Sequence, residues 1–259
     1  MARWFFPHSI LLATLLPNVP VHAQADWLSI SGASPILSEA ASVSKKQEGF
    51  FGALVLGYQG TTGNTDTSSL NAKLSFGYVA PPWRHALMLR AVRGSTDDVT
   101  TVQEREAALQ SDYVFGDGHY VFGALNYTEN RFSGYDWRTT GVVGYGRRLL
   151  NTDRHTLDVQ AGAGTRRTRL SDGGRQHEEI VQLAGGYVWA FSEAGRFTQR
   201  VRVDYGSDNT FTELNTAVES SLPYDLALSI SYTLQHNSNV PAGRVKTNTA
   251  TLVSVIYGF

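Results

Sequence analysis

The feature that most constrains the fold is the alternation of apolar and polar residues, which continues from Phe50 to the last residue. Neighbouring side chains of a β-strand point to opposite faces, so this alternation predicts strands with one apolar and one polar face. Twelve such segments follow one another, and they form an all-β chain: Phe50–Thr61, Thr67–Val79, Trp83–Gly94, Thr101–Phe115, His119–Asn130, Trp137–Leu150, His155–Arg169, Glu178–Phe191, Arg196–Gly206, Phe211–Leu222, Leu226–His236 and Val245–Phe259.

The connections between these segments alternate in character. Tight turns are predicted at Ala80–Pro82, Gly116–Gly118, Asn151–Arg154, Ser192–Gly195 and Pro223–Asp225. Longer polar loops are predicted at Thr62–Asp66, Ser95–Thr100, Arg131–Asp136, Leu170–His177, Ser207–Thr210 and Asn237–Arg244. Short periplasmic turns and longer external loops are typical of transmembrane barrels, and an even strand number places both termini in the periplasm. None of the eight prolines interrupts a predicted strand, as a closed ladder requires.

A soluble β-sandwich would show the same alternation, so the apolar face has to decide between the two architectures. This face carries almost no charge in mid-strand, and many of its segments end in aromatic residues, namely Tyr58, Tyr78, Phe115, Phe191, Tyr205, Tyr257 and Phe259. Aromatic girdles of this kind mark the two edges of a bilayer. Lipid cannot form hydrogen bonds with the unpaired backbone N–H and C=O groups of an open strand edge, so the sheet must close. We therefore predict one antiparallel transmembrane β-barrel over residues 50–259, closed by the C-terminal strand.

The N-terminal segments differ from the barrel. One positive charge at Arg3 precedes an apolar stretch that is too short to cross a bilayer, and small residues follow it. This pattern predicts a secretory signal peptide over residues 1–25, cleaved after Ala23 or Ala25. Residues 26–49 are rich in Ser and Ala and lack sustained alternation, which predicts a partly disordered periplasmic leader. A plug inside the lumen is an alternative for this leader.

Composition excludes several functions. The formal net charge is −1 and only 17% of residues are charged, so the basic surface of a nucleic-acid-binding protein is missing. The absence of Cys excludes a disulfide framework, a thiolate metal site and a Cys nucleophile. A mean hydropathy of −0.21 excludes a bundle of transmembrane helices and agrees with a barrel, in which only alternate residues meet lipid.

The predicted polar faces carry the candidate functional residues. They are Lys73, Arg84, Arg90, Glu104, Glu106, Asp112, Asp158, Arg166, Arg200, Arg202, Asp204, Glu213 and Glu219. One interpretation is a narrow polar pore whose transverse field orients small ions or zwitterions. The other is a set of paired charges that fills and rigidifies the barrel, since twelve strands lie between packed eight-stranded barrels and aqueous sixteen-stranded porins. An open row of charges is expected in a pore, and a closed ladder of pairs in a structural barrel.

Other chemistry is weakly supported. A membrane-embedded lipid hydrolase would need a Ser nucleophile within reach of a His base, and His236, Asn237 and Ser238 are suitable types. Adjacent strand residues point apart, however, and no G-x-S-x-G or H-E-x-x-H sequence occurs, so we expect no enzyme. Outer-loop carboxylates could hold Ca²⁺, but solvated loop charge is the simpler interpretation: Asp66, Asp97, Asp98, Glu129, Asp136, Asp172 and Asp208. No cofactor or metal is expected.

Resemblance to known proteins adds to these predictions. The last strand, with Tyr257 and a final Phe259, resembles the closing strand of outer-membrane barrels, which serves as the recognition signal for the barrel-assembly machinery. Residues 62–73, 131–136 and 237–244 resemble the DUF481 family of uncharacterised outer-membrane proteins, which includes YdiY-like proteins described as salt-induced. The resemblance implies a Gram-negative outer-membrane barrel. We expect this barrel to be a monomer in contact with membrane lipid and lipopolysaccharide. It transfers no substrate, cofactor or catalytic residue.

Overall fold

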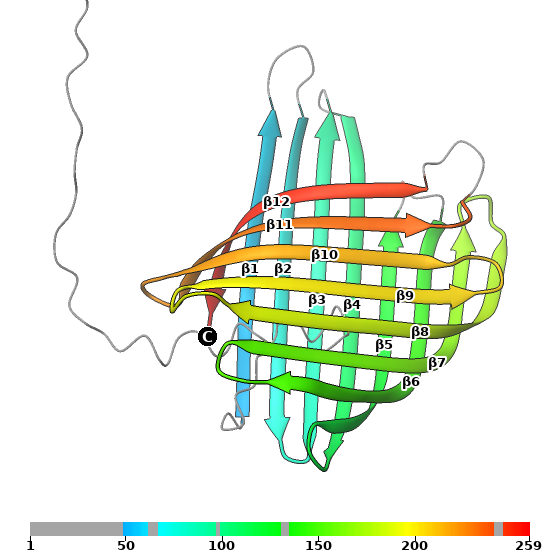
Figure 1. Cartoon of the computed structure of the whole chain (residues 1–259). Coiled ribbons are helices and arrows are strands. Elements are labelled where there is room, and N and C mark those ends of the chain that lie inside the picture. Colours follow the sequence, from blue (N-terminus) through cyan, green and yellow to red (C-terminus); the bar gives the residue numbers. More distant parts are fainter. Residues whose placement is uncertain (1–48, 62–66, 97–98, 131–134, 241–245) are drawn as a thin grey trace, which may run out of the picture.

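The computed structural model describes residues 49–61, 67–96, 99–130, 135–240 and 246–259, and these form a closed antiparallel barrel (Figure 1). Each strand pairs with its neighbours in sequence, and β1 pairs with β12. This confirms the predicted fold. The strands are β1 (Gly49–Thr61), β2 (Thr67–Ala80), β3 (Trp83–Thr96), β4 (Val99–Phe115), β5 (His119–Asn130), β6 (Tyr135–Asn151), β7 (His155–Leu170), β8 (Arg175–Ala190), β9 (Gly195–Gly206), β10 (Phe211–Leu222), β11 (Leu226–Asn237) and β12 (Thr247–Gly258).

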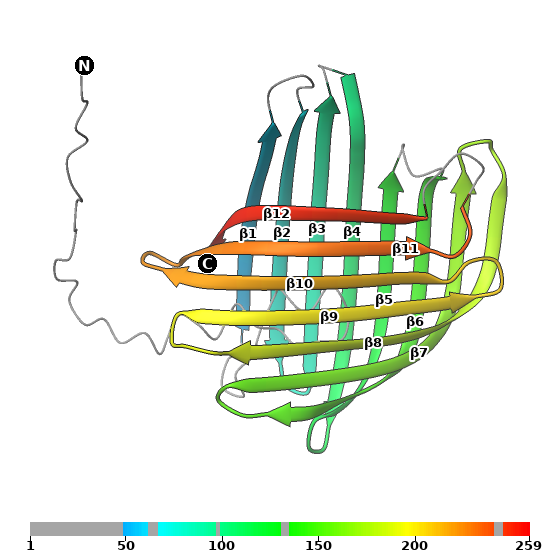
Figure 2. The ribbon, with the colours of Figure 1, turned by 45° about the horizontal axis from the view of Figure 1, so that its top comes forward.

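The two walls of the barrel cross each other because all strands are tilted. In Figures 1 and 2, β1–β4 run upright while β8–β12 cross in front of them. The described residues include no helix long and apolar enough to cross a membrane. The predicted signal peptide (1–25) and leader (26–49) lie outside the described residues, except for Gly49.

The seam between β1 and β12 closes the ring. Its register runs from Ala53 opposite Gly258 to Gly57 opposite Ser254. Phe259 continues this ladder: its carbonyl accepts from the Gly52 amide at 2.8 Å, and its amide donates to the Gly52 carbonyl at 3.0 Å. A ring closed in this way has no strand edge whose backbone N–H and C=O groups would face lipid without a hydrogen bond.

Alternation places apolar residues outside and polar residues inside. Val143, Leu183 and Ile230 are 70%, 57% and 54% exposed, although all three lie in mid-strand. Their sequence neighbours Val142 and Gln182 are 4% and 5% exposed and point into the barrel. A large apolar exterior of this kind is unusual for a soluble protein and suits a surface that lipid covers.

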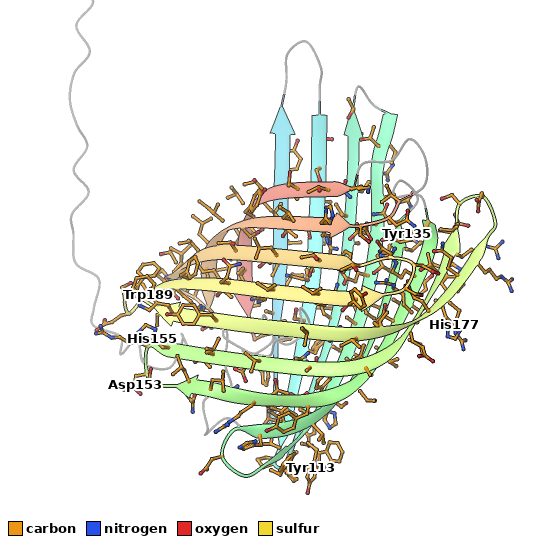
Figure 3. The ribbon with its side chains drawn as sticks, turned by 45° about the vertical axis from the view of Figure 1, so that its right-hand side comes forward. Tyr113, Tyr135, Asp153, His155, His177 and Trp189 are labelled. Atoms are coloured by element: carbon orange, nitrogen blue, oxygen red, sulfur yellow. The ribbon has the colours of Figure 1, made fainter. Side chains whose placement is uncertain are left out.

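Aromatic side chains gather at both ends of the apolar exterior. All seven residues of the predicted girdle are exposed. His155 stacks on Tyr187 and Trp189 with ring centroids 6.0 and 6.3 Å apart. Figure 3 shows Asp153, His155 and Trp189 at one end of the strands and Tyr135 and His177 at the opposite end. Of the girdle residues, Tyr58 and Tyr205 lie on the exterior near that opposite end, 65% and 67% exposed, and the other five lie near the end that carries Trp189. Exposed aromatic residues thus stand near both ends of the strands, as expected of a membrane barrel.

All predicted strand limits agree with the structure within three residues, but the loop predicted over Leu170–His177 is shorter than expected. The strand β7 continues to Leu170 and β8 begins at Arg175. A short hairpin turn joins them, with the Leu170 amide donating to the Gly174 carbonyl at 2.9 Å and Gly173 at φ +90°. Polar strand ends beyond the bilayer need no apolar face, so their alternation disappears although their ladder continues. The difference in length between outer loops and inner turns is therefore smaller than predicted.

Glycines allow two strands to approach closely inside the barrel. A Cβ placed on Gly164 of β7 would lie 1.9 Å from the carbonyl oxygen of Gly141 in β6. A Cβ on Gly146 would lie 2.1 Å from the ring of Tyr120. These glycines thus provide space inside the barrel that a larger side chain would fill.

Candidate functional site: the polar lumen

All thirteen charged residues of the predicted lumen set occupy inward-facing positions, in alternation with exposed or half-buried outward neighbours. The structure adds four inward charges that sequence reasoning missed: Arg138, Arg148, Glu178 and Arg196. Arg148 lies beside a register shift in β6, where the alternation is interrupted. The other three lie near predicted strand ends. Complementary charge on the neighbouring strand is the signal that identifies three of the four.

Six inward arginines face a carboxylate directly opposite on the adjacent strand, where paired side chains come within reach of each other. The pairs and their N–O distances to that carboxylate are Arg84–Asp112 at 2.9 Å, Arg90–Glu106 at 2.9 Å, Arg148–Asp158 at 3.2 Å, Arg166–Glu178 at 2.7 Å, Arg196–Glu219 at 3.2 Å and Arg202–Glu213 at 3.9 Å. Arg90 also pairs with Glu104, and Arg202 lies 3.8 Å from Asp204. The charges thus form a closed ladder along the wall.

The two remaining predicted residues lie among these pairs. Lys73 stands opposite Arg90 on β2 and faces inward. Arg200 donates to the Asn215 side-chain oxygen at 3.2 Å. Both stand on the inward face of the barrel.

Neutral side-chain amides donate further hydrogen bonds to the buried carboxylates. Gln110 donates to Asp112 at 2.8 Å, and both side chains are 0% exposed. Asn126 donates to Glu106 and Gln182 to Asp204, each at 2.8 Å. Buried charges require such pairing, and removal of one partner from a buried pair typically costs about 3–5 kcal/mol. The lumen is therefore a packed polar core in this conformation.

The half of the lumen near the tight turns is dry. Ala53, Ser75 and Ala227 are 2%, 0% and 0% exposed, and Asp158 on the opposite wall is 0% exposed. Tyr120 is 1% exposed and packs in a cluster with inward apolar residues of β5, β6 and β8. The Arg84 guanidinium lies 4.9 Å from the centroid of the Tyr120 ring. Side chains thus close the lumen at this level.

A second closure spans the opposite end. Arg138 on β6 donates to the Asn237 side-chain oxygen on β11 at 3.3 Å, and these strands lie five positions apart around the ring. Asn209, between β9 and β10, donates to the same oxygen at 2.8 Å. The backbone N–H of Asn209 also donates to Glu178 at 3.3 Å, and its backbone carbonyl accepts from Arg166. We call Arg138, Arg166, Glu178, Asn209 and Asn237 the rim bridge.

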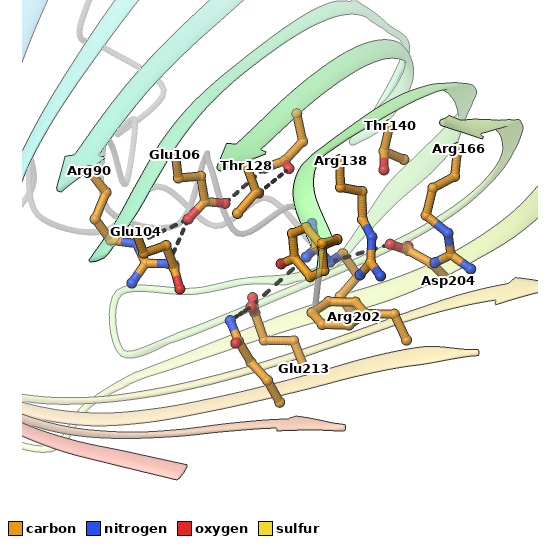
Figure 4. A pocket seen from close by; sticks show the side chains of 14 residues that line it. Arg90, Glu104, Glu106, Thr128, Arg138, Thr140, Arg166, Arg202, Asp204 and Glu213 are labelled. Atoms are coloured by element: carbon orange, nitrogen blue, oxygen red, sulfur yellow. Dashed lines mark hydrogen bonds and ion pairs between the residues drawn. The ribbon is translucent and has the colours of Figure 1, made fainter. Parts of the chain in front are cut away.

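A small cavity of about 30 Å³ lies beside the rim bridge, of which Arg138 and Arg166 line it. That volume is enough for about two water molecules. In Figure 4, Arg90, Glu104 and Glu106 lie on one side of it, and Arg138, Arg166 and Arg202 on the other. Asp204 and Glu213 also line it.

The alternative sites considered in the sequence are not assembled within the described residues. His236 exchanges a hydrogen bond with Thr247 at 2.8 Å, whereas the Ser238 hydroxyl contacts Asn209 at 3.4 Å and accepts from the Thr210 amide at 2.8 Å. No hydrogen bond between His236 and Ser238 is present in the described part of the chain. No three His, Asp or Glu side chains there come together as metal ligands, and Asp66, Asp97 and Asp98 lie outside the described residues.

Comparison with known proteins identifies the family. Residues 54–259 match the family described as "Protein of unknown function, DUF481". The chain belongs to the DUF481 family. This DUF481 protein is 27% identical over 235 residues to the uncharacterized protein YdiY of Escherichia coli strain K12, covering 89% of this chain and 92% of that protein. The resemblance predicted from the sequence is therefore confirmed.

Solved structures share the fold of this DUF481 barrel. The COG4313 outer membrane channel from Pseudomonas putida F1 matches with a TM-score of 0.52 at 10% identity, covering 83% of this chain and 97% of that channel. The NanC porin matches with a TM-score of 0.51 at 11% identity, covering 79% of this chain and 98% of that porin. The DUF481 protein is thus an outer-membrane β-barrel with a porin-like fold.

Proposed function

We propose that this DUF481 protein is a closed outer-membrane barrel with a structural role in the envelope, with both termini and the tight turns in the periplasm. The observation that carries the proposal is the double closure of the lumen. A dry layer around Ser75, Asp158 and Ala227 blocks one half, and the rim bridge blocks the other. The inward charges form a closed ladder, which is the arrangement expected of a structural barrel.

Opening this lumen would require the loss of buried interactions. A hydrated ion passing the dry layer would have to displace Tyr120 or separate buried pairs such as Arg84–Asp112. Separating a buried pair leaves an uncompensated charge, which is strongly unfavourable. The polar lumen therefore supports stability more readily than permeation.

Single-channel recording in a planar bilayer tests the proposal. Refolded protein comprising residues 26–259 is expected to give no steady conductance steps, while a heat-dependent shift in electrophoretic mobility shows that the barrel is folded. Steady ohmic steps from the folded wild type would overturn the proposal. A preparation lacking residues 26–48 tests the plug interpretation of the leader, since steps that appear only after this truncation would make the leader a plug.

A narrow ion pore that opens at the rim is the second candidate. It is favoured by the rim bridge, which depends on Asn209 in a connection between strands and on Asn237 at a strand end, with the cavity just inside. If the half of the lumen near the tight turns admits ions once the rim is open, Asn209→Ala and Asn237→Ala would produce steps that the wild type lacks. Ser207→Ala is the matched control, because Ser207 is exposed and its hydroxyl donates to its sequence neighbour Asp208 at 3.3 Å. Silent recordings from both asparagine variants would remove this candidate.

A further inference from the structure

Three guanidinium N–H groups without a protein acceptor border the small lumen cavity. Within the described residues, Nε of Arg138, Nη1 of Arg166 and Nε of Arg202 are buried and have no hydrogen-bond partner. All three side chains line the same cavity, and Arg166 is only 1% exposed. A buried donor without an acceptor is unfavourable, so three such donors on side chains that line one cavity favour an acceptor from outside the chain.

The carboxylates around the cavity do not provide this acceptor. Both oxygens of Glu106 are used, one by Arg90 at 3.0 Å and the other by Asn126 at 2.8 Å. Both oxygens of Glu104 are also used, by Arg90 and by Asn130. Asp204 accepts from Gln182, and its nearest oxygen lies 3.8 Å from the Arg202 Nε, too far for a hydrogen bond. Asp204 and Glu213, which line the cavity, therefore leave the three N–H groups without a hydrogen bond.

Among the described residues, Arg138 is the arginine at this cavity that has no ion pair. On the β4 side, Glu104 and Glu106 share Arg90 (Figure 4). The opposite side presents Arg138, Arg166 and Arg202, and Asp204 and Glu178 are the carboxylates that face them there. Glu213 lies 3.9 Å from Arg202 and also accepts from Gln235 at 2.9 Å. Arg138 donates to a neutral amide, that of Asn237.

We infer that the Arg138–Arg166–Arg202 side of the cavity binds one small inorganic anion of halide size. The anion would accept hydrogen bonds from the three free N–H groups and compensate the charge of Arg138. A cavity of about 30 Å³ has no room for a sugar, a zwitterion or another organic anion. The site lies within the closed lumen, and its occupancy does not depend on whether the barrel conducts.

Diffraction from crystals of the full mature protein grown in sodium bromide tests the site directly. An anomalous bromide peak is expected within hydrogen-bond distance of Arg138 and Arg166. A cavity occupied by water alone would give no such peak, and this result would overturn the inference.

Thermal unfolding in detergent provides a second readout. Replacing gluconate with chloride at constant ionic strength is expected to raise the apparent midpoint by about 3 °C for the wild type. Arg138→Gln should abolish this difference, and Arg138→Lys, which keeps the charge but lacks Nε–H, should reduce it. The control Arg167→Gln removes an exposed, outward-facing charge and should leave it unchanged. An equal chloride effect in the Arg138 variants and the wild type would contradict the site.

Discussion

At the scale of single residues, the inner wall depends on which side chains are small. Gly164 faces inward beside the backbone of β6, whereas Gly123 on β5 faces outward, and a Cβ added there would have no atom within 4 Å. The same substitution should therefore have different consequences at these two positions, although both are glycines within a strand.

Substitutions at Gly164 and Gly123 provide a matched test of packing inside the barrel. Gly164→Ala is expected to lower the free energy of unfolding by about 1–3 kcal/mol or more, because its Cβ would meet the Gly141 carbonyl oxygen and backbone cannot move aside easily. Gly123→Ala should change it by less than about 0.5 kcal/mol. Urea titration of the refolded barrels, followed by electrophoretic mobility, measures both. Equal stability of the two variants would show that the lumen is less tightly packed than described.

Also at the residue scale, the sequence predicted inward orientation for thirteen charged residues by alternation alone. It missed Glu178 because this residue stands at a polar strand end, where no apolar face marks the register. Its role became evident only when β8 was placed beside β7, where Arg166 lies directly opposite at 2.7 Å. A charge at a strand end can be assigned from its cross-strand partner, which requires the register.

At the scale of elements, most strands gain their partners through tight turns to the next strand, but the seam joins the two ends of the barrel. Its register covers only Ala53–Gly57 of β1. Phe259 adds two backbone hydrogen bonds to this short ladder, and its ring lies 6.0 Å from that of Phe76. The last residue therefore contributes to closure through its contacts, separately from its proposed role with Tyr257 in recognition by the assembly machinery.

Removal of Phe259 tests this contribution in the absence of any assembly factor. The deletion is expected to destabilise the refolded barrel by about 2–3 kcal/mol through loss of two backbone hydrogen bonds and an aromatic contact. A lower urea midpoint of the heat-modifiable band would show it. Tyr224→Ala is the control, since that aromatic side chain is 85% exposed in a turn at the same end. If the deletion matched the control, Phe259 would act in cellular assembly only.

At the scale of the whole molecule, the closed fold of the barrel does not determine its orientation in the membrane. The structure determines that the tight turns lie at one end and the β7–β8 turn at the other, but the fold is the same whichever end faces the periplasm. The proposed orientation follows from strand number and from the tight turns, as in other outer-membrane barrels.

Cysteine labelling of cells determines the orientation, because the natural chain contains no Cys. A bulky, membrane-impermeant maleimide is expected to label Ser171→Cys in the β7–β8 turn on intact cells. Asp153→Cys in the β6–β7 turn should react only after the outer membrane is permeabilised. Both positions are exposed in the folded barrel. The reverse labelling pattern would contradict the proposed orientation.

Alternation alone determined that this chain forms twelve strands with an apolar outside and a polar inside, because side-chain direction in a strand has a period of two residues. Whether the inward charges form an open row or a closed ladder depended on the tertiary structure. Pairing needs the register of neighbouring strands, as for Arg148 opposite Asp158, and the crossing from Arg138 to Asn237 needs the curvature of the whole ring. These contacts join residues far apart in the chain, so no local pattern encodes them.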